Sequence, residues 1–101
     1  MPFPIVPTDP GVTRQVLAET PDLMVVAFRF ATGAQGKLHN HPHIQSTYVE
    51  SGGFTFHLAG VDHVLQPGDS LILPSGLQHG CVCHAAGVLI DTFTPRRDDF
   101  L

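Results

Sequence analysis

Three histidines and a carboxamide lie within seven residues near the middle of the chain, at His39, His41, His43 and Gln45. Alternate side chains of a β-strand point to the same face, so His39 and His41 can converge on one ion. Gln45 has the same parity, which permits its side chain to face the same interior. Imidazole nitrogens bind divalent Zn, Ni, Cu, Mn or Fe, and an amide oxygen can complete the ligand set. The spacing predicts a metal site, although a His-x-His pair alone is also typical of surface histidines beside a turn.

A second segment also ends in a histidine. Residues 68–73 indicate a turn and a strand, residues 74–76 a further turn, and His79 begins the next strand. Cys81 and Cys83 share the parity of His79. A disulfide across a single intervening residue would be badly strained, so we expect two reduced, buried thiols that pack as small hydrophobes. Outside both segments, assigned to the surface or the core, lie His57, His63 and His84.

The C-terminal part of the chain carries an acid, an aromatic ring and a guanidinium of one strand parity, at Asp91, Phe93 and Arg97. An inward carboxylate at the end of the apolar run 87–90 is unusual unless it is used. A guanidinium binds a carboxylate through two parallel hydrogen bonds. These side chains are therefore candidates for one wall of a cavity, with ordinary core packing as the alternative for Phe93. Arg96 has the opposite parity and is expected to face solvent, and the two acids after Arg97 to form a solvated tail.

Short strands must position these residues. The 101 residues are 43% hydrophobic, include 10 Gly and 9 Pro, and show neither an internal repeat nor a helical stripe. Runs rich in β-branched and aromatic residues alternate with Gly- and Pro-containing turns, which predicts an antiparallel sandwich or small barrel as a single domain over residues 1–101. The expected strands are Val12–Ala18, Leu23–Ala31, Lys37–Asn40, Gln45–Glu50, Phe54–Ala59, Val61–Leu65, Ser70–Leu73, His79–Cys83 and Val88–Thr94.

Charge and composition exclude several classes of partner. The formal net charge is −4 and no basic cluster exceeds two residues, which argues against nucleic acid. The apolar runs are too short to cross a membrane, and the N-terminus lacks the features of a signal peptide. Two reduced thiols favour the cytoplasm. The Pro-rich arm, residues 1–10, is expected to be an edge strand or to cover a second subunit, which predicts a homodimer.

Together the two histidine segments resemble the two sequence motifs of the cupin superfamily. The first motif is matched by Gly33 or Gly36, followed by His39, His41, Gln45 and Gly52, and the second by Gly68, Pro74, Gly76 and His79. The resemblance implies an all-β fold, the antiparallel double-stranded β-helix or jelly-roll barrel. It also implies one divalent metal ion, such as Zn, Ni, Mn or Fe, held by His39, His41, Gln45 and His79. Where the second motif usually ends in Asn, this chain has Cys83.

Many cupins carry Glu at the position of Gln45. Four neutral ligands leave the charge of a divalent ion uncompensated, so the site should favour an anionic oxygen ligand. This predicts a substrate with a carboxylate and argues somewhat against redox iron. His43 could replace Gln45 as a ligand, but Pro42 interrupts the strand before it, so a place at the rim is the simpler interpretation.

A narrower resemblance is carried by residues 91–101, which are similar to the ending of the KdgF-type cupins. Residues 23–26 and 39–49 also resemble corresponding parts of that family. These cupins act in pectin and alginate breakdown on 4,5-unsaturated uronates, which are small anionic sugar acids. The resemblance implies conversion of the cyclic uronate to its linear 4-deoxy-5-keto form. In that reaction Asp91 would be the general acid or base, Arg97 would hold the carboxylate and Phe93 would wall the sugar ring. The alternatives are another metal-dependent cupin, such as an iron dioxygenase, or a non-catalytic module that binds a sugar or a metal.

Overall fold

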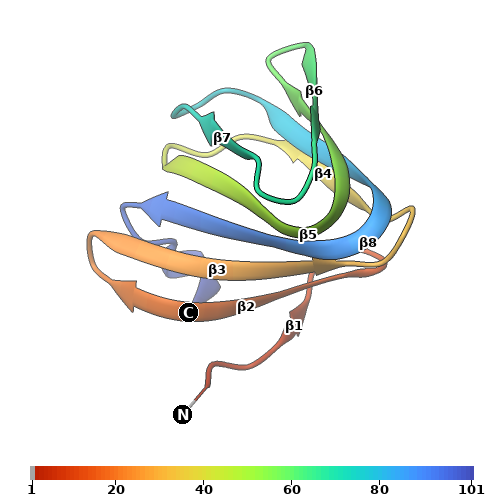
Figure 1. Ribbon diagram of the computed structural model, residues 1–101. Helices are drawn as coiled ribbons and strands as arrows, with labels where there is room; N and C mark the ends of the chain where they lie inside the picture. The colour runs from red at the N-terminus through yellow and green to blue at the C-terminus, as the bar shows by residue number, and fades with distance from the viewer. Residues whose placement is uncertain (1) are drawn as a thin grey trace.

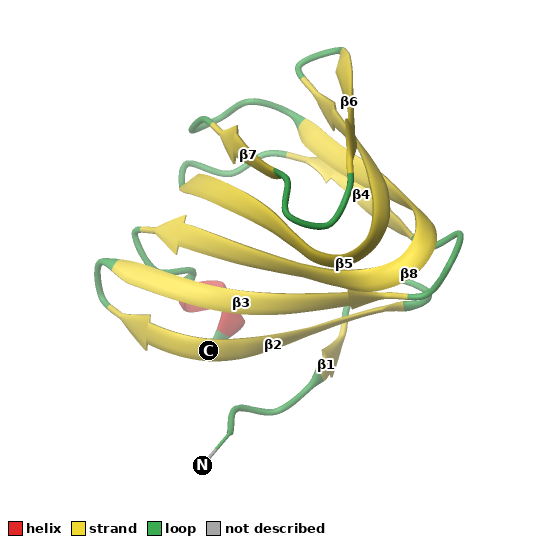
Figure 2. Ribbon diagram, viewed as in Figure 1, coloured by secondary structure: helices red, strands yellow, loops and turns green. Residues whose placement is uncertain are grey.

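Antiparallel β-strands make up most of the computed structural model, which describes residues 2–101 (Figure 1, Figure 2). The sheet order is β1-β2-β3-β8-β5-β6, with β4 paired to β8 and β7 paired to β5. The long strands β5 and β8 curve so strongly that the sheet rolls up (Figure 1), as expected for the jelly roll. The elements are β1 (Val6–Pro7), β2 (Val12–Thr20), β3 (Leu23–Phe30), β4 (Gln35–His39), β5 (Ile44–Leu58), β6 (Val61–Leu65), β7 (Ser70–Leu73), β8 (His79–Thr94) and the 3-10 helix η1 (Asp98–Phe100).

Two pairs of predicted strands are each one continuous strand. Residues 45–50 and 54–58 belong to β5, which ends one residue before the predicted strand end at Ala59, and residues 79–83 and 88–94 belong to β8. The predicted turn at Ser51-Gly52-Gly53 is instead a set of register shifts between β5 and β8. Gly52 has φ +80°, and a Cβ there would lie 2.3 Å from the carbonyl oxygen of Ala85. Glycine therefore lets the strand bend sharply while its pairing continues on both sides.

The core has two parts. Alternate residues of the strands bury the larger cluster inside the rolled sheet, including Phe54, Leu73 and Leu89. The smaller cluster lies under β2 and β3, where Met24 and Val26 pack with Phe93. Within the described residues, η1 is the one helical element, and no helix is long and apolar enough to cross a membrane.

The N-terminal arm lies along its own chain. Val6 pairs with Arg14 in the register between β1 and β2, and the side-chain amide of Gln15 donates a hydrogen bond of 3.0 Å to the carbonyl oxygen of Phe3. Phe3 also packs against the smaller core cluster. The edge-strand expectation for this arm therefore holds, and the homodimer remains a prediction.

Candidate metal centre and its cavity

Three imidazoles meet at one end of the rolled sheet. His39 ends β4, His79 begins β8, and the pairing of these strands places the two residues opposite each other. His41 follows in the loop between β4 and β5. One ring nitrogen from each of the three residues lies within 4.8 Å of the other two. His41 and His79 are buried, whereas His39 is exposed. The structure thus brings together the three histidines singled out from the sequence.

Backbone carbonyl groups fix the proton positions of all three rings. Because a carbonyl oxygen only accepts hydrogen bonds, the ring Nδ1 facing it must carry the proton and donate it. A neutral ring of this tautomer keeps its lone pair on Nε2, the usual arrangement of a metal-binding histidine. The Nε2 atom of His79 is buried and has no hydrogen-bond partner within residues 2–101. The contacts are His39 Nδ1 to Lys37 O at 2.6 Å, His41 Nδ1 to His43 O at 3.0 Å and His79 Nδ1 to Leu77 O at 3.1 Å.

Burial keeps two of these rings neutral. Desolvation lowers the pKa of His79 to about 4 and also lowers the pKa of His41. A hydrogen bond to Gln45 Oε1, which the ring can donate only when Nε2 also carries a proton, acts in the opposite direction but does not outweigh burial. Neutral imidazole is the form that binds a metal ion, so these rings need not lose a proton before binding one at neutral pH.

Gln45 completes a set of four neutral donors. Its side-chain nitrogen donates hydrogen bonds of 2.9 Å to Thr47 Oγ1 and to Asp91 Oδ2, which fixes the amide so that Oε1 faces His41. Oε1 lies 3.0 Å from His41 Nε2. With the His41 proton on Nδ1, both of these atoms offer lone pairs. Neighbouring ligands about 2.1 Å from one ion lie ~3.0–3.4 Å apart, so the pair has the spacing of two ligand atoms. The donor set therefore fits a divalent cation.

His43, Cys81 and Cys83 do not belong to this set of four donors. Cys81 and Cys83 are free and buried, as expected. Burial raises the pKa of Cys81 to about 12, so the neutral thiol, a poor ligand, persists at physiological pH. His43 offers its carbonyl oxygen to His41, and its ring packs on His41 and Phe93. His43 therefore helps to orient the ring of His41, a role that agrees with its predicted place at the rim of the site.

Asp91 lies next to the donor set on the central strand β8, opposite Thr47 of β5. It is 5% exposed; Oδ2 accepts the hydrogen bond from Gln45, whereas Oδ1 has no partner in the described chain. Burial raises the pKa of Asp91 to about 7, against the lowering effect of a hydrogen bond with Thr47. A carboxyl group with such a pKa can both give and accept a proton near neutrality.

One cavity of about 300 Å³ joins these groups. Its walls include three of the candidate ligands, His39, Gln45 and His79, and all three candidate catalytic residues, Asp91, Phe93 and Arg97. The inward carboxylate at position 91 predicted from strand parity is therefore present. Phe93 is 2% exposed and belongs to the smaller core cluster, so it fills the core and lines the cavity at once.

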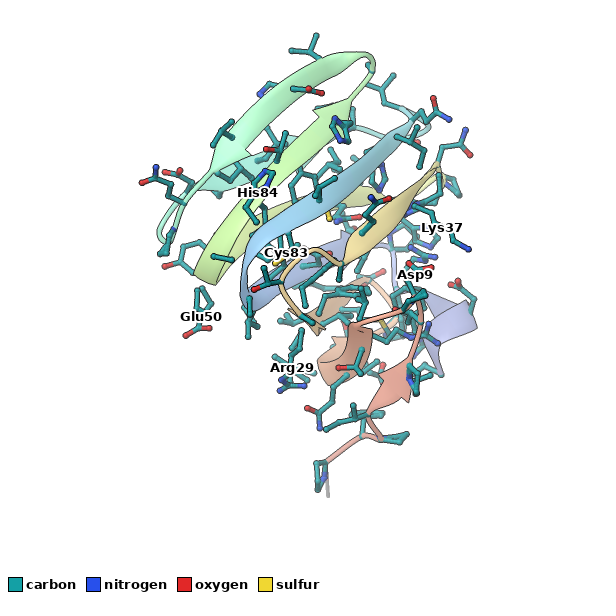
Figure 3. All side chains as sticks on the ribbon, turned by 90° about the vertical axis from the view of Figure 1, so that its right-hand side faces the viewer. Asp9, Arg29, Lys37, Glu50, Cys83 and His84 are labelled. Carbon is teal, nitrogen blue, oxygen red and sulfur yellow. The ribbon has the colours of Figure 1, made fainter. Side chains whose placement is uncertain are left out.

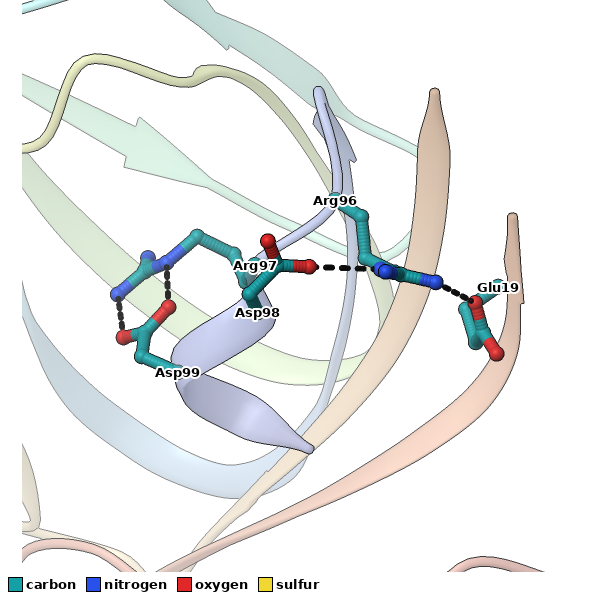
Figure 4. Close-up of polar contacts among 5 residues, drawn as sticks. All are labelled: Glu19, Arg96, Arg97, Asp98 and Asp99. Carbon is teal, nitrogen blue, oxygen red and sulfur yellow. Dashed lines mark hydrogen bonds and ion pairs between the residues drawn. The ribbon is translucent and has the colours of Figure 1, made fainter. Parts of the chain in front are cut away.

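Arg97 lines the cavity although it lies beyond the end of β8, where strand parity no longer applies. Strand β8 ends at Thr94, and Arg97 immediately precedes η1. Its Nε and Nη2 donate hydrogen bonds of 3.0 and 2.8 Å to the two carboxylate oxygens of Asp99 (Figure 4). The guanidinium carbon lies 5.2 Å from the centre of the Phe93 ring and 4.2 Å from that of Phe100. The position of the Arg97 guanidinium therefore depends on its contacts with Asp99 and Phe100 in the C-terminal residues.

The acids after Arg97 are exposed, as expected for a solvated tail, but each of them also forms an ion pair. Asp99 pairs with Arg97, which lowers the pKa of the Asp99 carboxyl group. Asp98 pairs with Arg96, whose guanidinium also binds Glu19 of β2 at 2.9 Å (Figure 4). Arg96 is thus partly buried in an ion-pair network rather than directed freely into solvent. The order of two arginines followed by two acids lets each arginine pair with the acid two residues later. This pattern could have predicted the ion pairs, which strand parity alone does not.

Sequence reasoning also missed groups at the cavity wall. Arg14 and Phe100 line it, and Lys37 lies 3.9 Å from Asp9, another lining residue (Figure 3). Arg14 could have been found, because it has the parity of Val12 and Val16, both buried. An arginine in an otherwise inward-facing apolar series is unusual unless its charge is used.

Known proteins share this arrangement of strands. The family model described as Cupin domain matches residues 26–93. The chain is 41% identical over 93 residues to the pectin degradation protein KdgF of Dickeya dadantii (strain 3937), covering 90% of this chain and 84% of that protein. An RmlC-like cupin from Shewanella frigidimarina matches with 42% identity and a TM-score of 0.93, covering 98% of this chain and 89% of that one. KdgF from Halomonas sp. matches with 40% identity and a TM-score of 0.92, covering 98% and 92%. The chain therefore belongs to the cupin family and, within it, to the group that includes KdgF.

Proposed function

We propose that this protein is a metal-dependent enzyme that converts a 4,5-unsaturated uronate released from pectin into the linear 4-deoxy-5-keto uronate. The observation that carries this proposal is that three of the four candidate metal ligands, a buried carboxyl group and a guanidinium line one cavity. The relative with 41% identity is named for pectin degradation, which supports a pectin-derived substrate.

The reaction is an isomerisation with no net redox change. The bond between C1 and the ring oxygen breaks, C1 loses its hydroxyl proton and becomes an aldehyde, and the former ring oxygen remains on C5 as an enol hydroxyl. The enol then gains a proton at C4 and loses its hydroxyl proton, so that C5 becomes a ketone. The protein must therefore supply and remove protons at C4 and at oxygen.

Each candidate residue has a role in this scheme. His39, His41, Gln45 and His79 would hold one divalent ion, which when bound polarises substrate oxygens as a Lewis acid. Asp91 is the proposed proton carrier, because Oδ1 is free while Oδ2 is held by Gln45. Such general acid–base help contributes ~10²–10⁴ in rate.

Arg97 and Phe93 would hold the substrate. Asp99 occupies the Nε/Nη2 edge of the Arg97 guanidinium, which leaves the edge formed by Nη1 and Nη2 for a carboxylate. The buried Phe93 ring provides an apolar wall for the sugar. The free, buried thiols support a reducing compartment, and we expect the enzyme to work in the cytoplasm as a homodimer.

The test is the ultraviolet absorbance of the conjugated alkene and carboxylate in a 4,5-unsaturated monouronate. Metal-loaded protein should accelerate its loss. Asp91→Asn should lower kcat by ~10²–10⁴ with KM nearly kept, whereas Arg97→Gln should mainly raise KM, because the carboxylate contact exists before and during reaction. Glu50→Gln, an exposed change outside the cavity lining, is the matched control. Decay at the spontaneous rate with metal bound would defeat the proposed reaction, and substrate binding without turnover would indicate a non-catalytic module.

A further inference from the structure

Three cationic side chains line the cavity, and two of them are paired. Arg97 is bound through two hydrogen bonds to Asp99, and Lys37 faces Asp9 at 3.9 Å (Figure 3, Figure 4). Arg14 is different. Across residues 2–101 its guanidinium makes neither a hydrogen bond nor an ion pair, although its side chain lines the same cavity.

An aromatic ring holds Arg14 in place. The guanidinium carbon of Arg14 lies 4.2 Å from the centre of the Phe100 ring, and the guanidinium carbon of Arg97 lies at the same distance from that ring. Phe100 is itself packed edge-on against Phe28 and Phe93. Stacking uses the face of a guanidinium and leaves the N–H donors at its edge free. Phe100 thus supports two guanidiniums, one of which has all its donors available.

The charge balance also identifies Arg14. Asp99 compensates the charge of Arg97 and occupies one edge of that guanidinium, and Asp9 compensates Lys37. Arg14 therefore adds an uncompensated positive charge to the cavity wall. A partly buried guanidinium without a counter-ion gains from an anion that enters the cavity, and its planar fork suits a carboxylate.

We propose that Arg14 is a specificity-determining residue that binds the carboxylate of the substrate beside Arg97 and so selects acidic over neutral sugars. The class of ligand, a sugar acid, rests on the proposed function. The contact itself rests on the position of Arg14, its aromatic support and its lack of a partner.

The experiment compares wild-type protein with Arg14→Gln, Arg14→Lys and Arg29→Gln, all loaded with the metal that copurifies. Arg29 lies on the neighbouring strand β3 outside the cavity lining and bonds to Gln15, so it is the matched control. The substrates are a 4,5-unsaturated uronate and its neutral methyl ester. For the acid, Arg14→Gln should raise KM about 10- to 100-fold with kcat within a few-fold, as for loss of a charge-assisted hydrogen bond. For the ester, KM should change little. Arg14→Lys should recover part of the loss, and Arg29→Gln should match the wild type.

Equal losses for acid and ester in Arg14→Gln would show that Arg14 acts through packing, and would overturn the proposal. Unchanged KM for the acid would overturn it as well. If Arg14→Gln does not fold by circular dichroism, Arg14→Lys decides, because a point charge without the planar fork should still weaken the acid selectively.

If the wild-type protein shows no turnover, the proposed function is wrong, but the proposal that Arg14 binds a carboxylate is still open to test. Calorimetric binding of saturated D-galacturonate and D-galactose then replaces kinetics. The wild type should prefer the acid, and Arg14→Gln should reduce that preference about 10-fold or more. A wild type without preference, or a variant with the same preference, would overturn the proposal.

Discussion

Replacing Gln45 with Glu tests the buried contact between the donor set and the proposed proton carrier. The Gln45 nitrogen donates to Asp91 Oδ2 and to Thr47 Oγ1, each at 2.9 Å, and Gln45 and Asp91 are 4% and 5% exposed. An ionised Glu has no donor. It would also place a second carboxylate oxygen within hydrogen-bond distance of Asp91, so that two like charges share a site with little access to water.

The expected cost follows from these contacts. A hydrogen bond to a charged group contributes ~1.5–3 kcal/mol and one to a neutral hydroxyl ~0.5–1.5 kcal/mol, so the loss of both in Gln45→Glu should lower the free energy of unfolding by about 2–4.5 kcal/mol. A proton shared between the two carboxyl groups would keep the cost near the lower end. Asp91→Asn alone should cost about 1 kcal/mol, because Gln45 still finds a neutral acceptor.

Combining Gln45→Glu with Asp91→Asn transposes the amide and the carboxylate, so that a donor again faces an ionised acceptor. The double variant should therefore recover at least about 2 kcal/mol relative to the sum of the single changes. Urea denaturation of metal-free protein at constant pH, in excess chelator, measures all four proteins. An additive cycle, or a Gln45→Glu variant as stable as the wild type, would mean that the two side chains do not touch in solution. Gln45→Glu should also retain metal as tightly as the wild type or more tightly, because it adds an anionic ligand. The double variant should regain stability but not activity, because it lacks the proposed proton carrier.

Three further predictions concern the metal, the tail and the arm. Elemental analysis should find about one divalent ion per chain, and joint replacement of His39, His41 and His79 with Ala should abolish it; a metal retained in that folded variant would place the site elsewhere. Asp99→Asn should raise KM for the uronate about 3- to 10-fold with kcat kept, because it weakens two charge-assisted hydrogen bonds to Arg97. Asp99→Glu should recover part of the loss, and an unchanged KM in the Asn variant would show that Arg97 needs no such support. Deletion of residues 2–7 should lower the unfolding free energy of the chain itself, because this segment packs on β2; sedimentation tests the predicted dimer separately, and a monomer at micromolar concentration would contradict it.

The positions of the metal-binding candidates could be predicted because they depend on local geometry. His39 and His41 are only two residues apart and so stay close, although His41 lies in the loop after β4 rather than on a strand, and the turn ending at Gly76 leads to His79 at the start of β8. Asp91 and Phe93 share a face by strand parity, because β8 remains regular to Thr94. The continuity of β5 and β8 was missed for a physical reason. Glycines at 52 and 53 have the composition of a turn, but Gly52 allows close approach of β5 to residues 85–87.

The end of the cavity that we propose to bind the substrate carboxylate depends on contacts that no local pattern contains. Arg97 is predicted both by the resemblance of residues 91–101 to the KdgF-type cupins and by strand parity, but the parity argument does not apply, because β8 ends at Thr94. Its actual position comes from Asp99 and from the ring of Phe100. Arg14 lies more than 80 residues from Phe100 in the sequence, yet the two are stacked.

The two ends of the cavity therefore arise differently in the fold, and this has a consequence for specificity. Nearby strand ends and the carbonyl groups of adjacent residues hold the candidate metal ligands, so that end is set by the sheet itself. The other end exists only when η1 packs Phe100 against Phe28 and Phe93. Changes in the tail or in β2 can alter which anion is bound while the donor set stays intact. Cupins that share the histidine geometry can thus differ in substrate, because affinity for the ligand is determined by residues that the metal-binding motifs do not contain.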